Sequence, residues 1–268
     1  MGKKIYAPVN GVARNVKKMY VPVNGVARKV KKAYKGVNGK ARLVFVETPT
    51  LNSSFASNTW ENIILACQLG IVPNTWAVGN QKAMTINATE YVVVIIGKNH
   101  DYYANGSGTA PLTFQLLACY NTRYAMNDSQ TNSGGWGNSD MRYSRLPEIF
   151  RLMPVEVQNA VREVYKETSA GDQSTDLFGT ADKLFLLSES EVFGKTTNSA
   201  SGEGEQYAYY ATGGTTSKTK RVNGVISEWW TRSPYKANSV GFCAVNKDRL
   251  SDGFVANNGN GVSFAFCF

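Results

Sequence analysis

The sequence predicts an α+β protein in which a series of N-terminal β-hairpins precedes one larger mixed domain. Two observations predict this class. A 14-residue unit occurs three times within the first 46 residues, and each copy carries Asn-Gly between strand-forming residues. After the repeat, two segments with helical periodicity are embedded among many short strand-like runs and wide loops. Helices and strands distributed in this way are typical of α+β domains.

The N-terminal repeat has a constant period over residues 3–16, 17–30 and 31–44, with Lys-Lys-x-Tyr, Val-Asn-Gly and Ala-Arg at matching offsets. Asn-Gly, at 10–11, 24–25 and 38–39, favours a type I′ turn because both residues tolerate positive φ. Each copy is therefore predicted to form a β-hairpin, and Pro8 and Pro22 indicate edge strands. Because an isolated hairpin is barely stable, we expect residues 1–46 to pack on neighbouring copies, on other subunits or on a larger assembly.

The positive charge of the chain is concentrated in this repeat. The formal net charge is +9, yet residues 1–46 contain 12 Lys or Arg and no Asp or Glu, which leaves 17 basic and 20 acidic residues for the rest. The repeat either docks on an acidic partner or presents a solvated face that keeps strand edges from pairing. With one Tyr per copy for stacking on bases, nucleic acid is not the expected partner.

The larger domain, residues 47–268, begins at the segment Glu47-Thr-Pro-Thr50, where the charge density falls. A helix is predicted from the N-cap Thr59 to the C-cap Gly70, and strands are predicted near 75–78, 82–86 and 91–97. A second helical region is predicted over about 144–166, with Pro154 in a first turn. Its apolar stripe consists of Val157, Ala160, Val161 and Val164.

The C-terminal half is predicted to return to strands. The run 184–187 is expected to be a short buried strand, followed by a brief helix that Ser188 and Glu191 cap and Gly194 ends. Residues 195–224, rich in Gly, Ser, Thr and Asn, are predicted to form a long surface loop. Strand-like runs follow at 229–230, 240–245, 254–255 and 262–268. Their apolar residues are expected in the core: Trp229, Trp230, Phe242, Val245, Val262, Phe264 and Phe266.

Five segments, in this order, resemble blocks of a known family: 95–101, 134–142, 182–194, 229–235 and 261–267. The chain resembles domains of phages and prophages that are similar to the formylglycine-generating-enzyme subset of C-type-lectin folds. That subset includes the variable proteins of diversity-generating retroelements. The resemblance covers most of residues 55–268, and the repeat resembles segments that precede such domains in phage proteins. It implies a C-type-lectin-like fold for residues 47–268.

Four positions depart from the pattern of this family. Ser263-Phe264 stands where the family has Arg-Pro, Arg249 where a turn glycine is common, and Thr231 where a large apolar residue is common. The family pattern also gives the Asn-rich tract 246–260 two interpretations, which both stay open. Asn codons suit a region diversified at adenines, and the same residues suit an ordinary turn-rich hairpin.

In the variable proteins that the chain resembles, a C-terminal surface is mutated to change ligand specificity. In this sequence residues 235–260 are expected to form a hairpin and loops above the core. Tyr, Asn and Arg on a rigid scaffold give adaptable recognition at a low entropic cost. The residues expected to be displayed there are Tyr235, Lys236, Asn238, Asn246, Lys247, Asp248, Arg249, Asp252, Phe254, Asn257, Asn258 and Asn260.

The sequence favours binding over catalysis. The single histidine, His100, is expected to form a structural pair with Asp101. No phosphate-binding Gly-rich loop, nucleophile elbow or calcium-lectin triplet occurs, so no catalytic residue, metal or cofactor is implied. Cys67, Cys119, Cys243 and Cys267 are expected to be buried free thiols. Cys243 and Cys267 could be neighbours in a sheet, which leaves an oxidase of the formylglycine-generating type as the least favoured alternative.

We therefore expect a non-enzymatic, adhesin-like or receptor-binding protein of a phage or prophage. Its C-terminal face would bind a host-surface protein or glycan, and its repeat would attach it to a virion or to further copies of itself. A structural virion component without a ligand of its own is the alternative. No secretory signal is seen, and the apolar run 91–96 is too short to span a bilayer. The chain is expected to be made in the bacterial cytoplasm and to leave it only within a larger particle, such as a virion.

Overall fold

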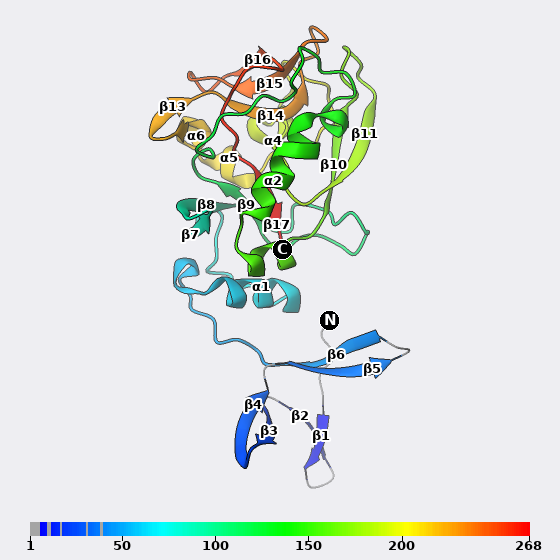
Figure 1. Ribbon diagram of the computed structural model, residues 1–268, viewed down its shortest axis with the longest axis vertical. Coiled ribbons are helices and arrows are strands. Elements are labelled where there is room, and N and C mark those ends of the chain that lie inside the picture. The colour runs from blue at the N-terminus through cyan, green and yellow to red at the C-terminus, as the bar shows by residue number, and fades with distance from the viewer. Residues whose placement is uncertain (1–5, 10–11, 17, 31, 38–39) are drawn as a thin grey trace.

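The computed structural model describes all residues except 1–5, 10–11, 17, 31 and 38–39. Figure 1 shows a mixed body at one end of the long axis and the N-terminal hairpins at the other. The body combines helices with several separate antiparallel sheets. The predicted α+β class is therefore confirmed.

The repeat forms three separate two-stranded sheets. Their strands are β1 (Tyr6–Val9), β2 (Val12–Asn15), β3 (Met19–Val23), β4 (Val26–Val30), β5 (Lys32–Val37) and β6 (Lys40–Val46). In the middle copy Val23 pairs with Val26 across a two-residue turn, in which Asn24 has φ 54° and Gly25 has φ 79°. These positive angles are those of a type I′ turn. The hairpin prediction is confirmed there, and the Asn-Gly pairs at 10–11 and 38–39 lie outside the described residues.

The first part of the body contains the helix α1 (Trp60–Leu69) and a four-stranded antiparallel sheet. The order of strands in the sheet is β17 (Ala265–Cys267), β9 (Thr113–Leu116), β8 (Thr89–Gly97) and β7 (Gln81–Ile86). Thr59 caps α1 by accepting a hydrogen bond from the Asn62 amide at 3.2 Å, and Gly70 ends it at φ 65°. Both caps were predicted, because they depend on residues adjacent to the helix. The predicted strand at 75–78 is wrong: the chain turns there, and Trp76 is buried with its indole N–H donating to the Asn52 carbonyl.

The second helical region is shorter than predicted. It consists of the π-helical turn η3 (Met141–Arg145), α2 (Leu146–Arg151) and α3 (Val155–Ala160), of which Pro154 is the N-cap residue. The chain then enters the strand β10 (Val164–Ser169), which pairs with β11 (Leu177–Asp182). The predicted apolar stripe is buried throughout. The stripe spans the helix α3 and the strand β10 that follows it. A run of buried residues does not by itself distinguish a helix from a strand.

The segment 184–187 is buried as predicted, but only Phe185 forms a bridge, to Ala265. The helix α4 (Glu189–Phe193) begins with the predicted capping box and ends at Gly194, whose φ is 70°. The predicted long surface loop over 195–224 is wrong. It contains α5 (Ala208–Thr212), α6 (Gly214–Lys218) and β12 (Lys220–Val222), which pairs with β13 (Val225–Ser227). Tyr207, Tyr210 and Lys220 anchor it in the core.

The last sheet is three-stranded, in the order β14 (Trp229–Pro234), β15 (Gly241–Val245), β16 (Ser251–Val255). All seven apolar residues predicted to be in the core of this region are fully buried. In Figure 1 this sheet lies at the end of the body farthest from the hairpins, whereas α1 lies nearest to them. No helix in the described ranges is long and apolar enough to cross a membrane.

Candidate functional site

The predicted ligand-binding residues lie at both ends of the β14–β15–β16 sheet. Because neighbouring strands are antiparallel, the loop 235–240 and the tail 256–260 lie at one end, and the turn 246–250 lies at the other. A strand of five residues separates the two ends by about 16 Å. We call the first group the loop end and the second group the turn end. The predicted residues therefore form two clusters, connected by the edge strand β16.

The predicted residues differ in exposure. The exposed ones are Lys236, Lys247, Asp248, Asp252, Asn257 and Asn258. The half-buried ones are Tyr235, Asn238, Asn246, Arg249 and Phe254. Asn260 is 5% exposed, so the expected display of this side chain is wrong. Its backbone forms a bridge with Tyr124, which draws the tail into the core.

The loop end is held by one buried amide. The Asn132 side-chain nitrogen donates to the carbonyls of Tyr235, Asn238 and Gly241, at 3.3, 2.9 and 2.7 Å. The ring of Tyr235 lies directly against Gly253, where a side chain would collide with it. An amide that is satisfied by three carbonyls keeps a loop in one conformation. The loop end is therefore a rigid platform beside exposed lysine and asparagine side chains.

The turn end is stabilised by its own polar residues. The Asn246 side-chain oxygen accepts hydrogen bonds from the amides of Asp248 and Leu250, at 2.9 and 3.0 Å. Arg249 has φ 65°, in the left-handed region that favours glycine. Its Nε donates to the Thr219 hydroxyl, and Lys247 forms an ion pair with Glu228 at 3.2 Å. Asn246 and Arg249 thus have structural contacts of their own.

Phe254 belongs to the core more than to the surface. It is half-buried and packs edge-to-face on the Trp230 ring, with 6.4 Å between centroids. Aromatic pairs of this geometry stabilise a core beyond the area they bury. The exposed candidates on either side of it are Asp252 and the residues of the loop end.

A buried ion network, which the sequence did not predict, connects five segments of the chain. Lys166 on β10 contacts the carboxylates of Asp101 and Glu191, the second at 3.0 Å. Arg232 on β14 contacts Glu191 at 2.5 Å. The Tyr207 hydroxyl donates to Asp101 at 2.7 Å. Each of these side chains is at most 4% exposed.

The charges of the network hold one another in the ionised state. Burial on its own raises the pKa of Asp101, but Lys166 and the hydrogen-bond donors around the carboxyl bring it down to about 2. Burial likewise acts against the charge of Lys166, and Asp101 and Glu191 raise its pKa above the ordinary value. The charged groups of Asp101, Lys166, Glu191 and Arg232 contact one another in the core. Their arrangement stabilises the fold.

The pKa of Glu203 is shifted in the opposite direction to those of Asp101 and Glu191. Burial raises the pKa of Glu203 to about 7, although the Ser233 hydroxyl and the Ser169 amide donate to it. Two other buried atoms nearby, Arg232 Nε and Thr168 Oγ1, have no hydrogen-bond partner within the described part of the chain. The buried polar groups around Glu203 are therefore less completely hydrogen-bonded than those around Asp101.

His100 does not form the predicted pair with Asp101. Its ring stacks on Tyr207 with 4.0 Å between centroids, because Asp101 is engaged by Lys166, Thr113 and Tyr207. The four cysteines are buried free thiols, as predicted. Cys243 lies on β15 and Cys267 on β17, in different sheets, so the suggestion that they are sheet neighbours is wrong. Burial raises the pKa of both thiols well above the ordinary value.

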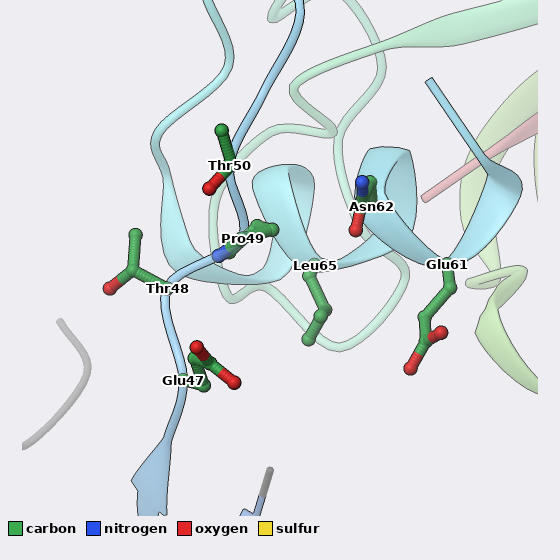
Figure 2. Close-up of a pocket in the computed structure, with 7 residues that line it drawn as sticks. All are labelled: Glu47, Thr48, Pro49, Thr50, Glu61, Asn62 and Leu65. Atoms are coloured by element: carbon green, nitrogen blue, oxygen red, sulfur yellow. The ribbon is translucent and has the colours of Figure 1, made fainter. Parts of the chain in front are cut away.

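The surface around α1 carries two adjoining recesses with acidic walls. The recess between residues 47–50 and α1 has a volume of about 190 Å³, and Figure 2 shows Glu47 and Glu61 on either side of Leu65. Glu61 and Leu65 also line the groove between α1 and α3, of about 540 Å³, together with Glu156. Glu47 forms an ion pair with Lys29 of the second hairpin. We call the two recesses together the α1 groove.

These features define an α+β protein in which three hairpins precede a body that has a buried ion network and polar loops at one end. A model of the family described as "Domain of unknown function (DUF6273)" matches residues 107–268, more than half of the chain. The chain belongs to that family. No curated protein and no solved structure matches it significantly. The matched region begins between β8 and β9, which are neighbours in one sheet.

Proposed function

We propose that this chain is a non-enzymatic ligand-binding protein of adhesin type from a phage or prophage. On this proposal the body has a C-type-lectin-like fold, and a host-surface protein or glycan binds at the loop end of the β14–β15–β16 sheet. The observation that carries it is the loop end itself: exposed Lys236, Asn257 and Asn258 stand beside a loop that Asn132 holds by three hydrogen bonds. Exposed polar side chains on a rigid scaffold suit recognition at a low entropic cost.

The polar chemistry of the body supports binding over catalysis. The strongly interacting titratable groups, Asp101, Lys166, Glu191 and Arg232, are buried and contact one another. A general acid or base has to reach the reacting atoms in a cleft. On this proposal the network stabilises the fold, and the exposed loop end binds the ligand.

The proposal is tested by binding of the fluorescently labelled full chain to fixed cells of the strain that carries the gene and of related strains. The triple variant Lys236→Ala, Asn257→Ala, Asn258→Ala should lose at least about tenfold in affinity, because recognition is concentrated in few residues. The matched control is Lys195→Ala, Gln173→Ala, Asn105→Ala, which removes one lysine and two amides elsewhere. Equal binding by both triple variants, or no cell binding by the parent chain, would contradict the proposal.

The repeat has a separate role in this proposal, the attachment of the protein to further copies of itself. Its hairpins expose apolar side chains, with Tyr20 at 54%, Val26 at 60% and Tyr34 at 58% exposure. Two-stranded sheets of this kind need a covering partner. The α1 groove has the complementary charge: Lys29 already pairs with Glu47, and Glu61 and Glu156 have no ion pair within the described ranges. We assign the groove to a hairpin of a second copy.

A further inference from the structure

A third recess lies between α2 and the end of β11, and none of the residues of the loop end or turn end lines it. Its volume is about 350 Å³. The walls carry the aromatic or cyclic side chains of Tyr143, Pro147 and Phe150 and the cationic side chains of Arg142, Arg151 and Lys183. Its one carboxylate, Asp182, is buried. The lining is thus net positive, although the body as a whole has more acidic than basic residues.

The guanidinium of Arg142 is fixed at one side of this recess. Its Nε donates to Asp182 at 2.6 Å, and its two terminal nitrogens donate to the carbonyls of Gly137 and Ala181 at 3.2 and 3.3 Å. Asp182 is itself held by the Trp136 indole N–H at 2.9 Å. A guanidinium has five N–H donors, so two of them are left over. Arg142 is therefore a preorganised cation with donors to spare for an anionic ligand.

The other two cations of the recess are free to meet a ligand. Neither Arg151 nor Lys183 forms an ion pair with any residue in the described part of the chain. Lys183 Nζ lies 5.5 Å from the centre of the Phe150 ring. The guanidinium carbon of Arg142 lies 5.0 Å from the centre of the Tyr143 ring, which is 65% exposed. The exposed Tyr143 ring provides a flat apolar surface beside the three positive charges.

From this combination we propose that the recess binds a carboxylated sugar ring, such as a hexuronate unit of a glycan. A carboxylate fits the guanidinium and the two free cations. One C–H face of the sugar ring fits the exposed ring of Tyr143, and the volume lies at the lower end of that of small-ligand pockets. Inorganic phosphate would contact the cations but would not contact the aromatic surface. The site is independent of the loop end, so the two assignments succeed or fail separately.

The test is saturation-transfer NMR of the full chain with glucuronate, with glucose as the neutral analogue. Glucuronate should receive saturation, most strongly at the ring protons of one face, and glucose should receive little. The variant Tyr143→Ala should weaken glucuronate binding roughly tenfold, because it removes the stacking surface. It leaves the net charge of the chain unchanged, so attraction of glucuronate to the basic repeat persists in this variant. The matched control is Tyr102→Ala, a tyrosine that is 69% exposed elsewhere.

A second pair of variants tests the cations. Arg151→Gln should weaken glucuronate binding, whereas Arg221→Gln, which removes the same charge at another exposed position, should not. Equal saturation of glucuronate and glucose overturns the assignment of an anionic sugar. Glucuronate binding that survives Tyr143→Ala and Arg151→Gln unchanged overturns the assignment of this recess. The loop-end triple variant should bind glucuronate like the parent chain, which separates this result from the adhesin proposal.

Discussion

Lys166 shows at the scale of one residue how the body depends on paired charges. Its ammonium lies between Asp101 and Glu191, and Glu191 in turn contacts Arg232. All of them are withdrawn from water. Breaking one member of such a buried set leaves another charge unpaired, which costs far more than an exposed pair contributes.

The substitution Lys166→Met should lower the free energy of unfolding by about 3–5 kcal/mol, because it leaves Asp101 without its cation. The control Lys183→Met removes an exposed lysine and should change stability by no more than about 0.5 kcal/mol. Urea denaturation followed by tryptophan fluorescence measures both. A loss for Lys166→Met that equals the loss for the control would show that the network is not stabilising.

Glu203 should make stability depend on pH in a direction opposite to that of Asp101. The pKa of Glu203 is raised to about 7 from 4.5, so the folded chain keeps a proton that the unfolded chain loses. Stability therefore falls as pH rises from about 4.5 to about 7. The variant Glu203→Gln should lack this fall, so its stability relative to the parent should increase by about 3 kcal/mol across that range. Denaturation curves at several pH values test this, with Glu205→Gln as the exposed matched control; parallel curves for the parent chain and Glu203→Gln would contradict it.

At the scale of an element, the loop 235–240 depends on Asn132. The variant Asn132→Ala removes hydrogen bonds to three carbonyls, of which those of Tyr235 and Gly241 keep a backbone amide donor. We expect a loss of about 2–3 kcal/mol of stability and faster amide exchange across the loop. Hydrogen exchange monitored by mass spectrometry should localise the change to this region. The control Asn257→Ala, at an exposed asparagine, should leave amide exchange of the loop unaltered. If Asn132→Ala gave the same exchange pattern as this control, Asn132 would not hold the loop.

The elements also show what the sequence could predict. The helix α1 and the hairpin at residues 24–25 follow from local signals, Thr59 and Gly70 for the helix and Asn-Gly for the turn. The strand β10 was not predicted, because it pairs with β11 across the loop 170–176, which lacks the tight Asn-Gly turn of the repeat hairpins. A buried Val164 suits a helix and a strand equally well.

In the candidate site too, features with local signals were predicted and features that depend on distant contacts were not. The sequence located the exposed loops correctly at Lys236 and Asn257, because polar residues beside turn signals are usually on the surface. It did not predict the burial of Asn260, which follows from a bridge to Tyr124, 136 positions earlier. The ion network was also missed, since a buried Lys166 is identified only by its partners from distant segments.

At the scale of the whole molecule, the charge is divided between two ends. The hairpins carry the excess of Lys and Arg, whereas the body is slightly acidic and has the α1 groove on the side nearest to them. If hairpins of one copy dock on the groove of another, self-association should weaken with salt. It should also depend on the signs of a few identifiable charges.

The full-length variant Glu61→Lys, Glu156→Lys should self-associate at least about tenfold more weakly than the parent, because close like charges repel. The same holds for a second variant, Arg28→Glu, Lys35→Glu, in the hairpins. An equimolar mixture of the two variants should recover association, since each then meets opposite charge. Sedimentation velocity measures all three samples. A parent chain that stays monomeric, or a mixture that stays dissociated, would contradict docking on the α1 groove.

The ion network also bears on which fragments of the chain can fold on their own. Asp101 precedes the region that the family model matches, and Lys166, Glu191 and Arg232 lie within it. A fragment that starts at residue 107 would lose one partner of Lys166 and the strand β8 from the middle of its sheet. Such a fragment should accumulate as insoluble material in expression trials, whereas residues 47–268 should yield a dispersed, cooperatively unfolding body. We therefore expect the smallest autonomous unit of this protein to be larger than residues 107–268, which the family model matches.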